Sequence, residues 1–197
     1  MSGQTPPIAG IILTGFMGAG KTTAGALLAV RLGWRFVDSD RVVEERAGMN
    51  IAAIFERRGE PEFRRLEAEV IRETTQDEHI VLALGGGALE SATTREFLAS
   101  LPGWHMVFLD APLETLIGRC AGQPDAPVRP VLRDRERLAE RWKTRLPGYA
   151  QAKLTVGTAD RAPEAVAAAI VAAFFGDPAG EPVGAPVQAH SAPGARA

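Results

Sequence analysis

The residues best suited to chemistry stand at positions 15–22, where GFMGAGKT matches the pattern G-x-x-x-x-G-K-[ST] in full. A β-branched apolar run precedes this stretch and a helix-like run follows it. Glycines at these spacings let backbone N–H groups surround phosphates without Cβ clashes, and a helix N-terminus adds partial positive charge. Lys21 then reaches the β- and γ-phosphates, while the Thr22 hydroxyl ligates Mg²⁺. The motif predicts a nucleotide phosphate site with Mg²⁺ rather than a glycine-rich turn that binds nothing.

Two carboxylates, Asp38 and Asp40, follow the second strand-like run. A metal–nucleotide site needs an acidic group near Mg²⁺, and the third strand-like run ends in glycine rather than aspartate. Asp38 is therefore the candidate metal residue, and Asp40 could accept a hydrogen bond from an acceptor hydroxyl. Residues i and i+2 of an extended strand end point the same way, so both carboxylates are expected to face one ligand crevice. The alternative is that Asp40 only caps a helix beginning at Arg41.

Three glycines at 85–87 end the third strand-like run, and their lack of side chains lets a ligand approach backbone N–H groups. The alternative is a plain flexible turn. Arg145 shares an apolar stripe with Leu138 and Trp142, spaced i, i+4 and i+7, and is therefore expected to point inward. A guanidinium fork suits a carboxylate or phosphate held through two hydrogen bonds.

Two further arginines have both a functional and an ordinary interpretation. Arg64 could join Arg145 in holding an anion, or it could form an ion pair with neighbouring Glu67. Arg129 lies in the segment 122–133, which holds three prolines and precedes a helix-like run. This segment could be a lid whose arginine stabilises charge on a transferring phosphoryl group, or a solvated linker.

Strand-like and helix-like runs alternate along the chain. The strands are expected at 8–14, 34–37, 80–84, 105–109 and 153–156. The helices are expected at 21–32, 41–47, 51–58, 61–74, 92–101, 112–120, 134–146 and 163–175. Asn50 is expected to cap the helix at 51–58, and Gly59 to separate that helix from the next.

Five strands separated by helices indicate an α/β protein with a parallel sheet covered on both faces. Ligands bind such sheets beyond the carboxyl ends of the strands, where the loops after residues 14, 37, 84 and 109 lie. Residues 8–175 are expected to form one domain. Residues 1–7 are interpreted as a flexible leader and residues 176–197, rich in Ala, Pro and Gly, as a disordered tail.

Composition restricts the partners. The chain has 22 Lys and Arg against 24 Asp and Glu, a formal charge of -2, so no net positive field attracts nucleic acid or anionic lipid. Cys120 is the single cysteine, and the three histidines are far apart, which disfavours an internal disulfide or a histidine–cysteine metal site. The chain shows neither a signal-peptide pattern nor a bilayer-length apolar run, so a cytoplasmic protein that contacts no membrane is expected.

Together these motifs resemble the shikimate kinase family over about residues 11–174. The resemblance rests on the phosphate loop and on DSD at 38–40, EFRRLE at 62–67, GGG at 85–87, VRP at 128–130 and RLP at 145–147. It implies a three-layer P-loop NTPase fold of the nucleoside monophosphate kinase type, with five parallel strands in the order 2-3-1-4-5. It also implies an enzyme that uses ATP to phosphorylate the 3-hydroxyl of shikimate, a step towards chorismate and aromatic amino acids. The protein is expected to be a monomer.

The resemblance also assigns roles to individual residues. The ATP-binding residues are expected to be Gly18, Ala19, Gly20, Lys21, Thr22, Thr23, Arg119, Arg129, Arg161 and Pro163, with Mg²⁺ held near Thr22 and Asp38. The shikimate-binding residues, carried partly by helices at about 40–74, are expected to be Asp40, Phe55, Phe63, Arg64, Glu67, Gly86 and Arg145. Lys21, Asp40 and Arg129 are the expected catalytic residues, the last from a lid at about 122–133. Gly157 departs from the family pattern, in which an aspartate is common at this place.

Two other functions compete with this one. A kinase of the same fold acting on another small acid, such as gluconate, would also use the arginine pair. A GTP-binding regulatory module would need no acceptor site. The chain has no Asn-Lys-x-Asp guanine signature, and a switch protein has no need of inward-facing Arg64 and Arg145.

Overall fold

A computed structural model describes residues 7–122 and 134–176. Its single sheet consists of β1 (Gly10–Thr14), β2 (Arg35–Asp38), β3 (Ile80–Ala83), β4 (Trp104–Asp110) and β5 (Leu154–Gly157). All neighbouring strands pair in parallel, and their order is β2-β3-β1-β4-β5. This confirms the expected parallel sheet and its strand order.

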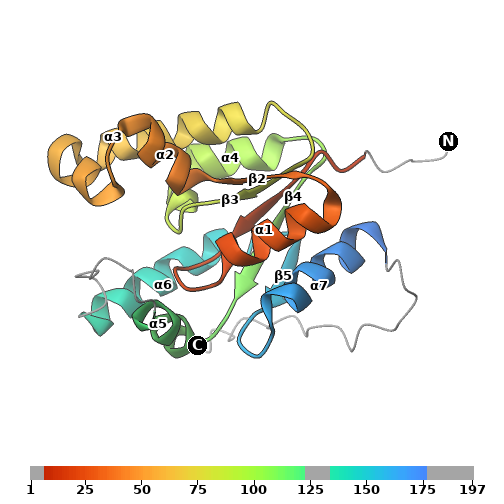
Figure 1. Cartoon of the computed structure of the whole chain (residues 1–197). Helices are drawn as coiled ribbons and strands as arrows, with labels where there is room; N and C mark the ends of the chain where they lie inside the picture. The colour runs from red at the N-terminus through yellow and green to blue at the C-terminus, as the bar shows by residue number, and fades with distance from the viewer. Residues whose placement is uncertain (1–6, 123–133, 177–197) are drawn as a thin grey trace, which may run out of the picture.

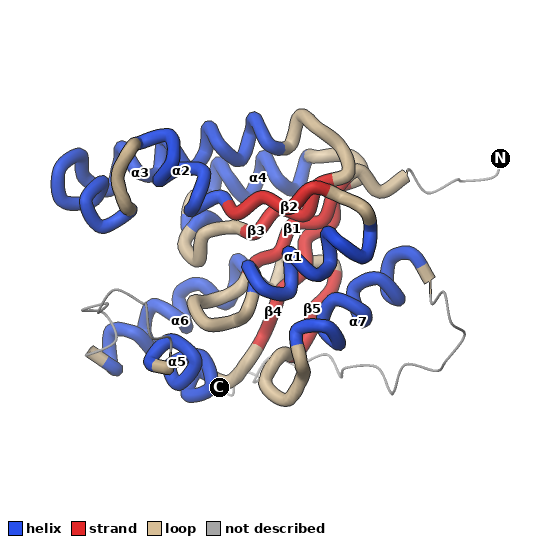
Figure 2. The backbone as a smooth tube through the Cα atoms, in the orientation of Figure 1, coloured by secondary structure: helices blue, strands red, loops and turns tan. Residues whose placement is uncertain are grey.

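Helices lie on both sides of this sheet (Figures 1 and 2). They are α1 (Lys21–Leu32), α2 (Ser39–Ala47), α3 (Ile51–Thr74), α4 (Ala92–Ser100), α5 (Leu113–Ala121), α6 (Arg135–Tyr149) and α7 (Pro163–Phe175), with a short 3₁₀ turn η1 (Ala88–Glu90). None of the helices in the described ranges is long and apolar enough to cross a membrane.

Ring contacts along β4 show how the two faces are covered. His105 stacks on Phe174 of α7, whereas Phe108 stacks on Tyr149 of α6, each with ring centroids 5.1 Å apart. Residues three apart in a strand point to opposite faces, so α6 and α7 cover opposite sides of the sheet. Helix α1 packs beside α7 (Figure 1).

The apolar interior has two parts. The main core surrounds the sheet and includes Ile11, Leu13, Leu82 and Val107, each fully buried. A smaller core joins α2 to α3 through Val43, Ile54, Phe63, Leu66 and Val70. The helices over residues 39–74 therefore form a packed unit of their own beside the sheet.

Several expected boundaries are wrong, for identifiable reasons. Asp38 is the extended last residue of β2, but Ser39 and Asp40 form neither a loop nor a continued strand end, because α2 already begins at Ser39. Asp38 caps this helix, accepting hydrogen bonds from the backbone N–H groups of Asp40 and Arg41 at 3.1 and 3.5 Å. Asp40 is thus in the first helical turn and is not the cap.

Other boundaries agree with the expectation or extend it. The Asn50 side chain caps α3 by accepting from the N–H of Ala53 at 2.8 Å, as expected. Gly59 interrupts α3 with φ 79° and ψ 168°, a left-handed φ that favours glycine, so the expected break lies where it was predicted. Helix α6 continues past the expected end at residue 146, because Tyr149 packs into the core and is only 1% exposed.

Candidate active site

A cavity of about 1050 Å³ opens at the carboxyl ends of β1, β2 and β3. This is the edge at which a parallel sheet is expected to bind its ligand. The cavity is lined by every predicted site residue within the described ranges, namely Gly18, Ala19, Gly20, Lys21, Thr22, Thr23, Asp38, Asp40, Phe55, Phe63, Arg64, Glu67, Gly86, Arg119, Arg145, Arg161 and Pro163. Arg129 and the rest of the predicted lid at 123–133 lie outside the described residues.

The loop between β1 and α1 has the backbone that a phosphate site requires. Gly18 and Gly20 have left-handed φ values of 77° and 87°. A Cβ on Gly18 would lie 2.5 Å from the carbonyl oxygen of Leu116, so a side chain could not be accommodated without a shift. No side chain caps the first turn of α1, which leaves its N–H groups available to an anion.

Lys21 stabilises this loop through hydrogen bonds to its backbone. Its ammonium donates hydrogen bonds to the carbonyl oxygens of Gly15 and Phe16 at 2.8 and 3.0 Å. Burial lowers the pKa of Lys21 to about 8, although the nearby Asp40 and Asp38 carboxylates oppose the shift. Phosphate oxygens are stronger partners for an ammonium than carbonyl groups, so a bound triphosphate would raise the pKa of Lys21 and further favour its charged form.

Thr22 and Asp38 meet across the cavity floor. The Thr22 hydroxyl donates a hydrogen bond of 2.8 Å to Oδ2 of Asp38. Mg²⁺ is usually bound by one or two protein oxygens together with substrate phosphates and waters, and this pair supplies one hydroxyl and one carboxylate. The described residues contain no group of three or more His, Cys, Asp or Glu side chains that could hold a metal by themselves. The pair therefore fits a cation that arrives with a nucleotide.

Two carboxylates converge over the backbone of Gly85. A Cβ on Gly85 would lie 2.3 Å from Oδ1 of Asp40 and 2.8 Å from Oε1 of Glu67. The N–H of Gly85 is held by the Ser39 hydroxyl at 2.9 Å, which fixes β3 against the start of α2. Glu67 is 4% exposed, and its Oε1 has no hydrogen-bond partner among the described residues. Burial raises the pKa of Glu67 to about 7, even though Arg64 favours its charged form.

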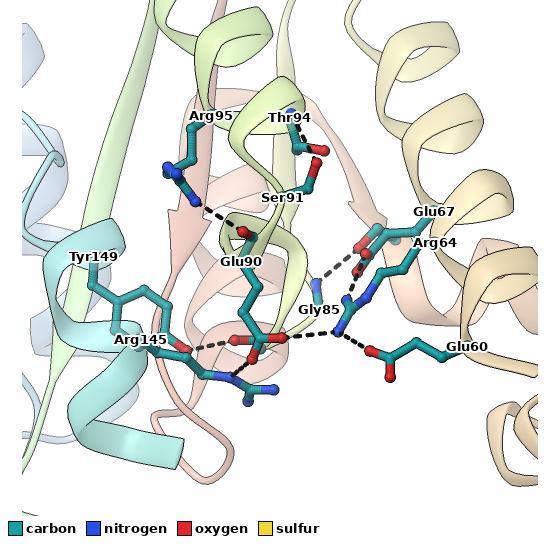
Figure 3. A network of polar contacts seen from close by, with 12 residues as sticks. Glu60, Arg64, Glu67, Gly85, Glu90, Ser91, Thr94, Arg95, Arg145 and Tyr149 are labelled. Atoms are coloured by element: carbon teal, nitrogen blue, oxygen red, sulfur yellow. Dashed lines mark hydrogen bonds and ion pairs between the residues drawn. The ribbon is translucent and has the colours of Figure 1, made fainter. Parts of the chain in front are cut away.

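Arg64 and Arg145 approach each other from different helices, α3 and α6 (Figure 3). Arg64 pairs with Glu67 at 2.8 Å, as its ordinary interpretation predicted, and also lines the cavity. Arg145 Nε pairs with Glu90 at 2.5 Å, and its side chain is only 10% exposed. The two guanidinium groups lie against Gly87, whose Cβ would come within 3.0 Å of both. Such a convergence suits an anion with two oxygens, such as a carboxylate.

Arg119 joins the phosphate loop to the loop after β5. Its guanidinium donates to the carbonyl oxygens of Gly18, Thr158 and Ala159 and to the Thr158 hydroxyl, over 2.5–3.4 Å. Arg161 and Pro163 follow in the same loop and also line the cavity. This part of the cavity therefore lies beside the phosphate loop.

Comparisons with known proteins agree with this geometry. The family model for shikimate kinase matches residues 17–174. The chain belongs to the shikimate kinase family. A shikimate kinase from Geobacter sulfurreducens is 42% identical over 156 residues, which cover 79% of this chain and 85% of that protein. One from Geobacter metallireducens is 40% identical over 160 residues, covering 81% and 88%.

Solved structures show the same fold. Shikimate kinase from Acinetobacter baumannii in complex with shikimate superposes with a TM-score of 0.79 at 37% identity, covering 87% of this chain and 95% of that one. A gluconokinase from Sinorhizobium meliloti, at 17% identity and a TM-score of 0.58, shares the fold alone. The chain is therefore a P-loop kinase that uses ATP, and the family sets aside both the regulatory GTP-binding module and the gluconate kinase.

Four polar residues at this shikimate kinase site were not predicted from the sequence. The Ser39 hydroxyl accepts from the N–H of Gly85, the Thr158 hydroxyl donates to the carbonyl oxygen of Asp110, and the Tyr149 hydroxyl donates to the carbonyl oxygen of Gly86 at 2.5 Å. Glu90 bridges Arg64 and Arg145. Glu90 is three residues beyond the triple glycine, and this proximity is the one signal in the sequence that could have marked it.

Proposed function

We propose that this chain transfers the γ-phosphate of ATP to the 3-hydroxyl of shikimate through the residues that line its cavity. The observation that carries the assignment is the placement of a phosphate loop and a pair of converging arginines in one cavity, which Asp40 also lines. One end suits a triphosphate and the other a carboxylate. The acceptor would therefore be held by its acid group, with its hydroxyls directed towards the phosphates.

The nucleotide end uses the N–H groups of residues 18–23 and the Lys21 ammonium to hold the phosphates. Thr22 and Asp38 would hold Mg²⁺, one per ATP, which supplies charge neutralisation at the phosphate oxygens. Arg119 and Pro163 would flank adenine, and Arg161, in the same loop as Pro163, would bind ATP beside them. Arg129 is proposed to act on the transferring phosphoryl group.

The acceptor end uses Arg64, Arg145 and the backbone of Gly86 to hold the shikimate carboxylate. Phe55 and Phe63, whose ring centroids are 4.8 Å apart, would form its apolar wall. Glu67 pairs with Arg64 and completes the pocket. Asp40 would accept a hydrogen bond from the 3-hydroxyl. A loose phosphoryl-transfer transition state needs little early proton removal, so orienting this hydroxyl accounts for most of the role.

The organisation and setting of the enzyme are also proposals. We propose a single kinase domain over residues 8–175, in which the helices at about 40–74 bind substrate. The chain would act as a cytoplasmic monomer on two small molecules, without nucleic acid or membrane. The charge of -2 and the single cysteine support this setting.

A coupled assay of ADP release tests the function. With ATP and Mg²⁺, shikimate should support turnover, and gluconate should not. Turnover with gluconate alone, or ATP binding without transfer to either acid, would contradict the proposal.

A further inference from the structure

Glu90 connects the two arginines of the acceptor end. It is the last residue of the 3₁₀ turn η1, directly after the triple glycine. Its Oε1 accepts from Arg145 Nε at 2.5 Å, and its Oε2 accepts from Arg64 Nη2 at 3.3 Å (Figure 3). One carboxylate thus joins α6 to α3, two helices that reach the cavity from different sides.

The backbone that carries Glu90 is held firmly. The guanidinium of Arg95 donates to the carbonyl oxygens of Leu89 and Glu90 at 2.6 and 3.0 Å. The N–H of Glu90 donates to the carbonyl oxygen of Gly87 at 2.9 Å. The side chain therefore projects from a fixed turn rather than from a free loop end.

Glu90 leaves both Nη atoms of Arg145 available to a ligand, whereas on Arg64 it shares Nη2 with Glu60, and Glu67 accepts from Nη1. Arg64 and Arg145 line the cavity, whereas Glu90 is not among the described residues that line it. Within the described ranges, Glu90 is the carboxylate that pairs with Arg145, and it does so through Nε. Both Nη atoms of Arg145 lie beside the glycine backbone, near the Cβ positions of Gly86 and Gly87.

Two guanidinium groups this close repel each other unless an anion lies between them. Arginine is also a long side chain, and ordering it on ligand binding costs affinity. A carboxylate that pairs with both groups before the ligand arrives offsets the repulsion and removes much of the ordering cost. A second carboxylate, from the ligand, then meets a pair that already has the right spacing.

We propose that Glu90 is a positioning residue for acceptor binding, which sets the spacing and direction of Arg64 and Arg145 for the acceptor's carboxylate. This inference rests on the proposed function, because it assigns that carboxylate to the arginine pair. Glu90 should therefore affect binding of the acceptor's acid group and leave nucleotide binding unchanged.

The test substitutes Glu90→Gln and compares shikimate with its methyl ester. An amide is uncharged and has one acceptor oxygen, so it cannot reproduce the two separate charged contacts that Oε1 and Oε2 of Glu90 make with Arg145 and Arg64. KM for shikimate should rise about fivefold, with kcat and KM for ATP changed less than about twofold. The dissociation constant of the ester, measured by calorimetry, should not change. Glu69→Gln removes an equally charged, arginine-paired glutamate from α3 outside the cavity and should leave all these values as in the wild type.

Two results would overturn the proposal. Tighter binding of shikimate by Glu90→Gln would show that Glu90 competes with the acceptor's carboxylate. Equal weakening of acid and ester would show a general structural role. If Glu90→Gln does not fold, Glu90→Asp, which keeps the charge but reaches less far, should still give a rise in KM that is specific to the acid. Failure of the proposed function would instead appear in the wild type, as absent transfer to shikimate.

Discussion

The Thr22 hydroxyl donates a 2.8 Å hydrogen bond to Oδ2 of Asp38, which ties the first turn of α1 to the end of β2. The other oxygen of the same carboxylate caps α2 through the N–H of Asp40. Asp38 therefore lies beside the proposed metal position and also fixes the helix that carries the proposed acceptor residue. The two aspartates are coupled through the backbone, yet the Asp38 carboxylate contacts Thr22, whereas Oδ1 of Asp40 lies over Gly85 beside Glu67.

The first prediction separates the two aspartates. Asp38→Asn should raise the Mg²⁺ concentration needed for turnover and leave shikimate binding largely intact, because asparagine caps a helix about as well as aspartate. Asp40→Asn should lower turnover roughly 10²-fold and weaken shikimate binding, with normal Mg²⁺ dependence. Turnover across a Mg²⁺ titration at fixed ATP, beside calorimetry with shikimate, measures both. Proportional loss of both properties in both variants would contradict the division.

The second prediction concerns the charge of Lys21. The pKa of this ammonium is lowered to about 8 by burial, so its cation is lost as the pH rises through that value. kcat/KM for ATP, which reports the free enzyme, should fall above about pH 8. kcat should begin to fall only at a higher pH, because bound phosphates favour the charged ammonium of Lys21.

Lys21→Ala serves as the matching variant. Loss of one such electrostatic group costs roughly 3–4 kcal/mol of barrier, so turnover should nearly vanish. Steady-state kinetics over pH 6–10 check both statements. Near-normal turnover in folded Lys21→Ala, or a flat kcat/KM profile for ATP up to pH 10, would contradict them.

Local signals explain what could be predicted from the sequence. The phosphate loop is a contiguous motif. The cap that Asn50 provides to α3 and the break at Gly59 depend only on residues a few positions away. The parallel sheet follows from the alternation of strands and helices. The order of the strands came from the family resemblance, since alternation alone leaves the order open.

Contacts between distant segments explain what could not be predicted. The pairing of Glu90 with Arg145 joins residues 55 positions apart, and no periodicity marks it. The extension of α6 to Tyr149 depends on packing against Phe108 of β4, which overrides the proline signal at Pro147. The start of α2 at Ser39 depends on Asp38 taking the cap position, which the alternative interpretation of the sequence gave to Asp40.

The third prediction tests the arginine pair. Arg64→Lys and Arg145→Lys should each weaken shikimate binding roughly tenfold, because an ammonium is a point charge and cannot form the fork. ATP affinity should hardly change. Calorimetry with shikimate and its methyl ester measures the effect. Equal affinity of the wild type for acid and ester would show that the pair does not hold the carboxylate.

The fourth prediction uses two glycines at strand ends. Gly85→Ala places a methyl group 2.3 Å from Asp40 Oδ1 and 2.8 Å from Glu67 Oε1, so both carboxylates must move. Shikimate binding should fall at least about tenfold and stability by about 1–3 kcal/mol. Gly157→Ala, at the end of β5, meets nothing within 4 Å and should be close to neutral in both. Calorimetry and thermal unfolding of the two variants test the pair, and similar losses in both would refute this account of Gly85.

The fifth prediction follows from the burial of Glu67. Its pKa rises from 4.5 to about 7 in the folded protein, so the native state holds this proton more tightly than the unfolded chain does. The corresponding stabilisation is present below about pH 4.5 and is lost as the pH rises to about 7. Glu67→Gln cannot ionise and escapes this loss. Relative to the wild type, its free energy of unfolding should therefore improve by on the order of 2 kcal/mol between pH 4.5 and 8.

Glu62 provides the control for this prediction, because the pKa of its carboxyl shifts in the opposite direction on folding. Its pairing with Arg65 on the exposed face of α3 lowers the pKa of its carboxyl, so its contribution is complete above about pH 4.5 and is lost only as the pH falls further. The stability difference between Glu62→Gln and the wild type should therefore be flat from pH 5 to 8, where that of Glu67→Gln changes. Urea unfolding of the three proteins at several pH values measures these slopes. A flat difference for Glu67→Gln over the same range would show that Glu67 is already charged in the folded enzyme near pH 5, held so by Arg64 in spite of its burial.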